Sequence, residues 1–175
     1  MPGPAGLPAG SARLGSWVLL AYRLPREPSN PRVAVWRKLE RLGVARLGDG
    51  LVALPADART REQLDWLAEE IHEGGGVATV WLATPASAAQ ERAIAEAMRA
   101  ARAAEYQAVI AQARAAAAGD AAERTRVLRL RGELRRIARR DYFPPPERDA
   151  ARAAVDALAA DAAAAETPAV VEAGP

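Results

Sequence analysis

The residues best suited to chemistry are a group of cations near the amino terminus. Seven basic side chains lie between Arg23 and Arg46, against only Glu27 and Glu40. Because phosphate contacts by arginine and lysine dominate nucleic-acid affinity, this excess predicts a surface that binds polyanions. The candidate nucleic-acid-binding residues are Arg23, Arg26, Arg32, Arg37, Lys38 and Arg41. The alternative is an ordinary solvated helix face in an arginine-rich chain.

A second group of cations lies between Glu123 and Asp141, where eight arginines accompany three acidic residues. These arginines are spread around the expected helix rather than aligned along one side. Exposed pairs at such spacing stabilise a helix only weakly. Surface solubility is therefore favoured over phosphate binding for this group.

No pattern indicates catalysis. His72 stands among acidic residues and is expected at the surface without a role as a general base. Gly74-Gly75-Gly76 precedes an expected strand, whereas a phosphate-binding loop opens a helix. Asp49, in the turn Gly48-Asp49-Gly50, has no neighbouring ligands for a metal. The sequence predicts no catalytic residue, no metal site and no cofactor.

Composition narrows the classes of protein further. The chain has 175 residues, a net charge of +2 and no cysteine, so it holds no disulfide, thiolate nucleophile or zinc knuckle. This composition suits a reducing cytoplasm, where we expect the protein. No run of about 18 apolar residues indicates a membrane span. Residues 1–15 carry proline and glycine where a signal peptide needs an apolar stretch, and are expected to be a disordered leader.

Residues 16–83 carry most of the large apolar side chains and are expected to fold as one small α+β domain. A buried strand at Trp17–Tyr22 precedes a helix from Asn30 to Gly43. The inward stripe of this helix is expected to consist of Val33, Trp36, either Leu39 or Glu40, and Leu42. A hairpin turning at residues 48–50, a helix capped by Thr60 and a strand at Val77–Leu82 follow. The order predicts a ferredoxin-like βαββαβ domain with both helices on one face of an antiparallel sheet.

The other face of that sheet is expected to be covered. The first and last strands are apolar on both sides, and Trp17 and Trp81 are predicted in the core together with Trp36. Only Trp66 is expected to be partly exposed. Either the rest of the chain or a second copy in a homodimer would cover this face.

Residues 84–145 are expected to form an α-helical hairpin. A long helix from Ser87 to Ala118 is followed by one whose seam consists of Val127, Leu130, Leu134 and Ile137. Residues 146–175 predict an alanine-rich C-terminal helix with marginal packing, since it offers little beyond Val155 and Leu158, and then a disordered tail.

Several short blocks resemble the amino-terminal domain of the bacterial chromate-resistance regulator family ChrB, over roughly residues 16–145. The blocks are Tyr22–Ser29 (YRLPREPS), Arg32–Leu39 (RVAVWRKL), Leu42-Gly43, Leu54-Pro55, and Arg140–Phe143 (RDYF) followed by prolines. The resemblance implies a regulatory or accessory protein of chromate resistance that regulates transcription by binding DNA. It also implies a separate protein that supplies the carboxy-terminal domain usual in that family, and from the uncovered sheet face we expect a homodimer.

The first two blocks are also similar to the central module of PaaX-type repressors, which shares a fold with Cas2 nucleases. Those nucleases hold a metal with an aspartate at the end of the first strand, where this sequence reads Ala21-Tyr22-Arg23. A Cas2-like metal-dependent nuclease is therefore the least favoured hypothesis. The remaining alternative is a non-catalytic interaction module whose helical hairpin covers the sheet or recruits a partner protein.

Overall fold

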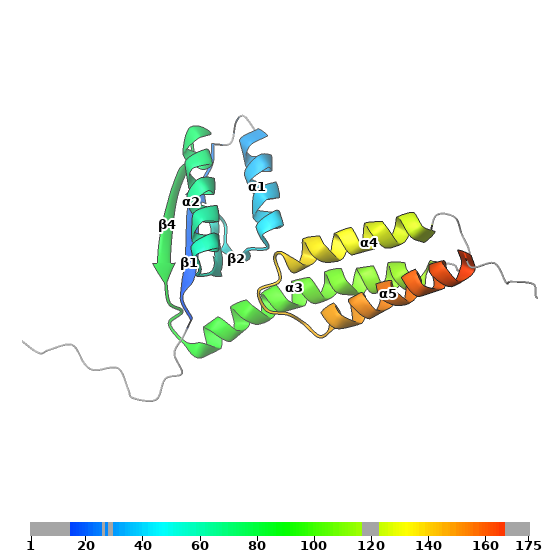
Figure 1. The fold of residues 1–175 in the computed structure, drawn as a ribbon. Coiled ribbons are helices and arrows are strands. Elements are labelled where there is room, and N and C mark those ends of the chain that lie inside the picture. The colour runs from blue at the N-terminus through cyan, green and yellow to red at the C-terminus, as the bar shows by residue number, and fades with distance from the viewer. Residues whose placement is uncertain (1–14, 26, 28–29, 117–122, 167–175) are drawn as a thin grey trace, which may run out of the picture. The chain divides into compact units, whose positions relative to one another are not determined.

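The computed structural model describes residues 15–25, 27, 30–116 and 123–166 (Figure 1). The described residues up to Ala97 and those from Met98 onward form two compact units. The first unit holds strands and two helices in the order β1 (Trp17–Arg23), α1 (Asn30–Leu42), β2 (Ala45–Gly48), β3 (Leu51–Pro55), α2 (Ala58–Glu73) and β4 (Val77–Ala83). Helix α3 (Ala88–Arg114) begins in the first unit, and α4 (Glu123–Ala138) and α5 (Glu147–Glu166) belong to the second. The predicted tail, and the predicted leader apart from Gly15, lie outside the described residues.

The four strands form one antiparallel sheet in the order β2-β3-β1-β4. β1 lies in the middle and pairs with β3 and β4, for example Leu20 with both Val52 and Val80. The β2–β3 turn requires glycine at position 50, where φ is +72° and a Cβ atom would lie 2.3 Å from the carbonyl oxygen of Tyr22. The predicted mixed α and β content and the antiparallel sheet are confirmed.

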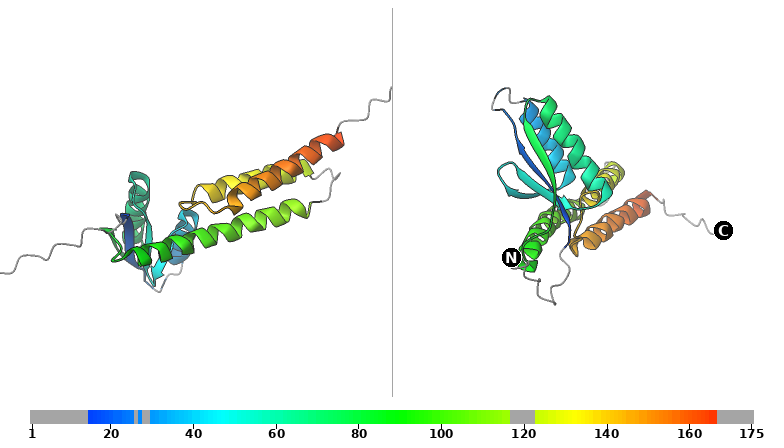
Figure 2. Two further views of the ribbon diagram at one scale, coloured as in Figure 1. Left: turned by 90° about the horizontal axis from the view of Figure 1, so that it is seen from below. Right: turned by 90° about the vertical axis from the view of Figure 1, so that its left-hand side faces the viewer.

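Helices α1 and α2 cover one face of the sheet (Figures 1 and 2). The strand pairings place alternate residues of β1 and β3 on this face. These strand residues and the helix residues that pack on them are almost inaccessible to solvent: Val18, Leu20, Val52 and Leu54 from the strands, and Val35, Leu39, Leu64 and Ile71 from the helices. Period-two alternation in the strands and a 3.6-residue period in the helices thus meet in one apolar core.

The inward stripe of α1 differs from the predicted one. Val35 and Leu39 are buried, whereas Val33 and Trp36 are exposed, Trp36 by 51 %. Both stripes satisfy helical periodicity, and the orientation of the helix on the sheet chooses between them. The prediction that Trp36 belongs to the core was wrong. Trp81, 58 % exposed on the edge strand β4, was also wrongly placed in the core.

The amino-terminal cap of α2 is Asp57, not Thr60 as the sequence analysis predicted. The Asp57 carboxylate accepts a hydrogen bond from the Thr60 backbone N–H at 2.7 Å, and the Thr60 hydroxyl accepts one from the Asp57 N–H at 3.0 Å. The same hydroxyl donates to the carbonyl oxygen of Pro55 at 2.7 Å. Thr60 is fully buried and completes a reciprocal capping box from inside the first turn.

The sheet face opposite α1 and α2 is covered in part. The indole N–H of Trp17 donates to the carboxylate of Glu91 at 3.2 Å, and Trp17 is only 3 % exposed. The first turns of α3 thus cover the end of the face beside Trp17, around a cavity of 210 Å³ that Leu19 and Ile94 help to line. Trp81 and Val77 on β4 are exposed on the same face.

The second unit is a packed set of three helical segments. The predicted seam of α4 is confirmed as core, joined by residues of α3 and α5: Tyr106, Val109, Ala113, Val127, Leu130, Leu134, Ile137, Ala151, Val155 and Leu158. The expectation of marginal packing for α5 was wrong, because small alanines let the helix approach closely and bury Val155 and Leu158. Among the described residues, no helix has the length and apolar character needed to cross a membrane.

Candidate nucleic-acid interface

Helix α1 is built to present cations outward. Pro31 suits a first helical turn, and Gly43 ends the helix with φ at +69° while its N–H donates to the carbonyl oxygen of Leu39 at 3.1 Å. With Val35 and Leu39 buried against the sheet, Arg37 and Arg41 lie one turn apart on the exposed side. Arg41 also occupies the last turn, where a cation is favoured by the helix dipole.

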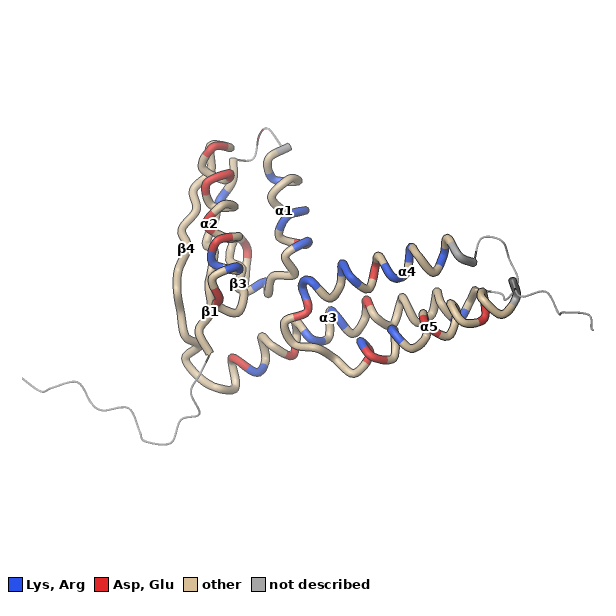
Figure 3. The backbone as a smooth tube through the Cα atoms, viewed as in Figure 1, with Lys and Arg blue, Asp and Glu red and all other residues tan. Residues whose placement is uncertain are grey.

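The charges of the two sheet helices differ in sign. Figure 3 shows basic residues along α1 and mainly acidic residues along α2. Lys38 forms an ion pair with Glu70 of α2, so this predicted phosphate contact is engaged inside the molecule. Within the described chain, neither Arg37 nor Arg41 lies within ion-pair distance of a carboxylate. Arg37 and Arg41 are therefore the cations of α1 that are available to an external anion.

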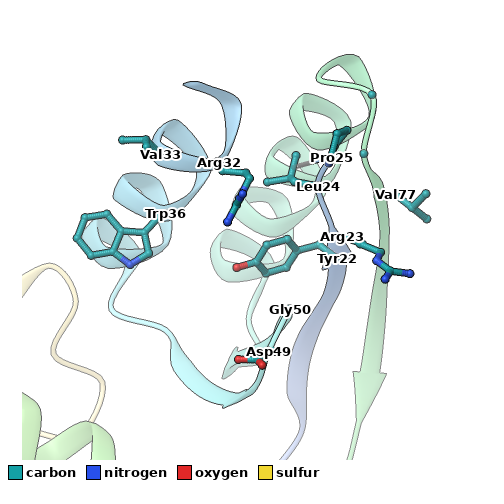
Figure 4. Close-up of a pocket in the computed structure, with 12 residues that line it drawn as sticks. Tyr22, Arg23, Leu24, Pro25, Arg32, Val33, Trp36, Asp49, Gly50 and Val77 are labelled. Carbon is teal, nitrogen blue, oxygen red and sulfur yellow. The ribbon is translucent and has the colours of Figure 1, made fainter. Parts of the chain in front are cut away.

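The other predicted cations do not join this pair in one patch. Alternation along β1 places Tyr22 and Arg23 on opposite faces of the sheet, with Arg23 beside Val77 of β4 (Figure 4). Arg32 lies on the first turn of α1 and makes contacts of its own. Arg26 lies outside the described residues. Sequence proximity alone grouped these side chains, and the sheet and helix geometry separates them.

A groove of about 1170 Å³ opens beside α1 at the end of β1 (Figure 4). Its walls come from four segments: the end of β1, the first turns of α1, the β2–β3 turn and the glycines before β4. Arg32 and Tyr22 point toward the space between α1 and β1, and Trp36 forms the outer wall. The one carboxylate in the described lining belongs to Asp49. Exposed indole and guanidinium groups can stack on bases and pair with phosphates, respectively.

Internal packing requires glycine at position 76 in the groove wall. A Cβ atom there would lie 2.6 Å from the carbonyl oxygen of Arg23 and 2.8 Å from a methyl carbon of Ile71. The chain therefore needs glycine for α2 and the end of β1 to come together. The run Gly74–Gly76 follows the end of α2, and Gly74 donates its N–H to the carbonyl oxygen of Glu70 at 3.0 Å.

The described residues hold no group of three or more histidine, aspartate or glutamate side chains placed to bind a metal ion. At the end of β1, where Cas2-like nucleases carry an aspartate, Tyr22 and Arg23 occupy the strand, and Asp49 lies in the turn beside Tyr22. A single carboxylate provides too few oxygen ligands to hold a magnesium ion by itself.

The second unit contains a polar cluster that sequence analysis did not find. Tyr106 of α3 is 1 % exposed, and its hydroxyl donates to the Asp141 carboxylate at 3.0 Å. Glu105 accepts from Arg140 at 2.5 Å and pairs with Arg102 at 2.7 Å. Burial of Tyr106, and then its bond to Asp141, raises its pKa to about 12. The RDYF block thus supplies Arg140 and Asp141, which follow α4 and form hydrogen bonds with Glu105 and Tyr106 of α3.

Arginines of α4 form hydrogen bonds with side chains of the neighbouring helices. Arg129 donates to Gln112 at 2.9 Å, and Arg131 donates to Asp156 at 3.3 Å. Arg136 lies 3.7 Å from Glu133 on the same helix. These contacts engage arginines of the second cationic group within the helical unit, for which the sequence favours surface solubility over phosphate binding.

Comparison with protein families shows to which family the chain belongs. A family model described as Protein ChrB, N-terminal, matches residues 32–168. The chain belongs to this family. Membership relates it to chromate resistance, and the predicted resemblance is confirmed. Comparison with curated proteins and with solved structures gives no match.

The ChrB match begins at Arg32 and ends beyond the described part of α5. It therefore includes α1 from Arg32 onward with Arg37 and Arg41, the hairpin, α2, β4 and all three helices that follow. The predicted resemblance stopped near residue 145, whereas the family match takes in α5. This agrees with the burial of Val155 and Leu158 in the helical core.

Proposed function

We propose that this ChrB-family chain is a cytoplasmic regulatory or accessory protein of chromate resistance that binds DNA through helix α1. The observation that carries the proposal is the exposed pair Arg37 and Arg41, one helical turn apart and without a carboxylate partner in the described chain. Two such cations on a rigid helix suit successive phosphates of a nucleic-acid backbone. The acidic surface of α2 would repel the backbone and so favour approach from the α1 side.

The element order of the first unit and its strand order β2-β3-β1-β4 fit the ferredoxin-like class, to which we assign the unit. Function on such a fold depends on the site, because the fold by itself hosts many activities.

The test is a titration of labelled duplexes with the full chain at low salt, one duplex from the promoter of a chromate-transport gene and one of random sequence. We expect binding that weakens steeply with salt. The double variant Arg37→Ala, Arg41→Ala should reduce the slope of log affinity against log salt by about 2. The control Arg59→Ala, Arg61→Ala removes the same charge from α2 and should leave the slope unchanged.

Two results would overturn the DNA-binding proposal. One is the absence of binding to both duplexes at low salt. The other is equal loss of affinity in the α1 and α2 double variants, because that would show an effect of net charge rather than a contact by α1. Equal affinity for both duplexes at every salt concentration would retain DNA binding and remove sequence-specific regulation from the proposal.

We also propose that the chain does not cleave nucleic acid. Support comes from Tyr22 and Arg23 at the end of β1 and from the single carboxylate, Asp49, in the described groove lining. Incubation of single- and double-stranded DNA and RNA with the protein and Mg²⁺ or Mn²⁺ should leave the substrates intact. Cleavage that is lost in Asp49→Asn would contradict this proposal and revive the nuclease hypothesis.

A further inference from the structure

The two outer edges of the sheet are protected to different degrees. The β2 edge is four residues long, carries Arg46 and contains a register irregularity between Arg46 and Gly48. A short strand, a charge and an irregular ladder are devices by which natural sheets prevent pairing with another strand. The β2 edge is therefore a poor template for a further strand.

The β4 edge has none of these devices. All seven residues of β4 pair regularly with β1, and the strand contains no charged residue and no proline. The opposite side of its backbone has no neighbouring strand in the described sheet. Along this edge Val77, Trp81 and Leu82 are exposed by 65, 58 and 63 %. A long, regular, uncharged edge with exposed apolar side chains is a docking site for another strand.

We propose that β4 pairs antiparallel with β4 of a second copy, so that one sheet runs continuously through a homodimer. In such a dimer the two-fold axis stands perpendicular to the sheet, and each side chain meets one from the same face of the partner. The register that pairs all seven residues places Val80 opposite the partner's Val80. Val77 then lies opposite the partner's Ala83, and Ala78 lies opposite the partner's Leu82.

The β4 sequence is self-complementary in this register. Each large side chain meets a smaller one: Trp81 lies opposite the partner's Thr79, and Leu82 lies opposite the partner's Ala78. Directly opposed side chains in an antiparallel pair have Cβ atoms about 4.5–5.5 Å apart, so large and small residues fit where two large ones crowd. If the register shifted by two residues, Trp81 would lie opposite the partner's Trp81 or the partner's Val77, and the strand ends would be unpaired. Self-complementarity is the requirement of a two-fold interface and favours a second copy over an unrelated strand.

Single-cysteine crosslinking tests the register. The chain has no cysteine, so each introduced thiol is unique. Under mild oxidation Val80→Cys should form a disulfide-linked dimer, because directly opposed Cβ atoms lie close to disulfide reach. Ala78→Cys alone and Leu82→Cys alone should not, but an equal mixture of these two variants should form a mixed dimer. Crosslinking of Ala78→Cys with itself, or none with Val80→Cys, would overturn the proposed register.

Sedimentation equilibrium tests the interface without oxidation. The wild-type chain should sediment at twice its monomer mass of 18.5 kDa. Trp81→Lys should raise the dimer dissociation constant by roughly tenfold or more, since a lysine at the edge must lose water and faces the partner's Thr79. The matched control is Trp66→Lys, which changes an equally exposed tryptophan on α2 and should leave the mass unchanged.

The outcomes also separate the rival occupants of the β4 edge. A monomeric wild-type chain that dimerises once residues 1–14 are removed would show that its own amino-terminal segment occupies the edge, and would overturn the proposal. A dimer insensitive to Trp81→Lys would place the interface elsewhere. Retention of secondary structure in circular dichroism shows that each variant is folded. DNA titration of Trp81→Lys reports separately on α1, so failure of this proposal is distinguishable from failure of DNA binding.

Discussion

The ammonium group of Lys38 on α1 pairs with the carboxylate of Glu70 on α2, while the adjacent guanidinium of Arg37 lies on the exposed side of the same helix. Consecutive residues on a helix differ in direction by about 100°, so neighbouring cations can serve different purposes. Lys38 helps to join the two helices, and Arg37 remains available to solvent.

This relationship predicts unequal effects on DNA affinity. Lys38→Ala should leave the salt dependence of DNA binding nearly unchanged, whereas Arg37→Ala should reduce the slope by about 1. Because the Lys38–Glu70 pair is partly exposed, its loss should cost stability by only about 0.2–1 kcal/mol. Salt titrations of binding and urea denaturation measure the two effects. A larger loss of salt dependence in Lys38→Ala than in Arg37→Ala would contradict the assignment.

The capping box of α2 predicts a pH-dependent contribution to stability. The Thr60 backbone N–H holds the pKa of Asp57 below its usual value, so the contribution is present above about pH 4 and is lost as pH falls through the lowered pKa. Asp57→Ala should lower the free energy of unfolding at neutral pH by about 1 kcal/mol. Asp57→Asn keeps an acceptor and should retain most of that stability while losing its acid dependence. Urea midpoints at several pH values test both statements.

The α4 seam predicts contrasting effects of one substitution at two nearby leucines. Leu130 is fully buried among α3, α4 and α5, so Leu130→Asp should destabilise the helical unit by on the order of 3–5 kcal/mol. Leu128 is 64 % exposed, and Leu128→Asp should leave stability within about 0.5 kcal/mol of wild type. Thermal denaturation followed by circular dichroism compares them. If Leu130→Asp instead dissociated an oligomer of folded chains, the seam would be an interface between chains.

The Tyr106–Asp141 hydrogen bond predicts an alkaline transition. Since the pKa of Tyr106 is raised to about 12, the folded state favours its protonated hydroxyl, and that stability is present up to about pH 10 and lost as pH rises toward 12. Ultraviolet absorbance should show a tyrosine phase that titrates late, and Tyr106→Phe should remove that phase. A late phase that persists in Tyr106→Phe would assign the raised pKa to another tyrosine.

Local patterns were sufficient for much of the first unit. A continuous apolar run predicted β1, the turn at residues 48–50 predicted the hairpin, and Gly43 predicted the end of α1 that the structure shows. The charge excess likewise identified α1 as the basic helix. These features depend on residues a few positions apart, so a short stretch of sequence contains their physical cause.

Other features depended on contacts between distant segments. Helical periodicity allowed two inward stripes for α1, and only packing on the sheet selected Val35 and Leu39 and exposed Trp36. The hydrogen bond between Tyr106 and Asp141 joins residues 35 positions apart, and no local sequence pattern predicts it. The expectation for α5 failed because it counted large side chains and neglected how closely alanines allow helices to approach.

By itself, the sequence determined the order of the elements, the sign of charge on each sheet helix and the family relationship, because each of these depends on the types and spacing of residues that are close together in the chain. The tertiary structure decided which cations are available, since ion pairs such as Lys38–Glu70 form only when two helices meet. It also decided that β4 is an unprotected edge, because strand order arises from long-range pairing that no single segment contains.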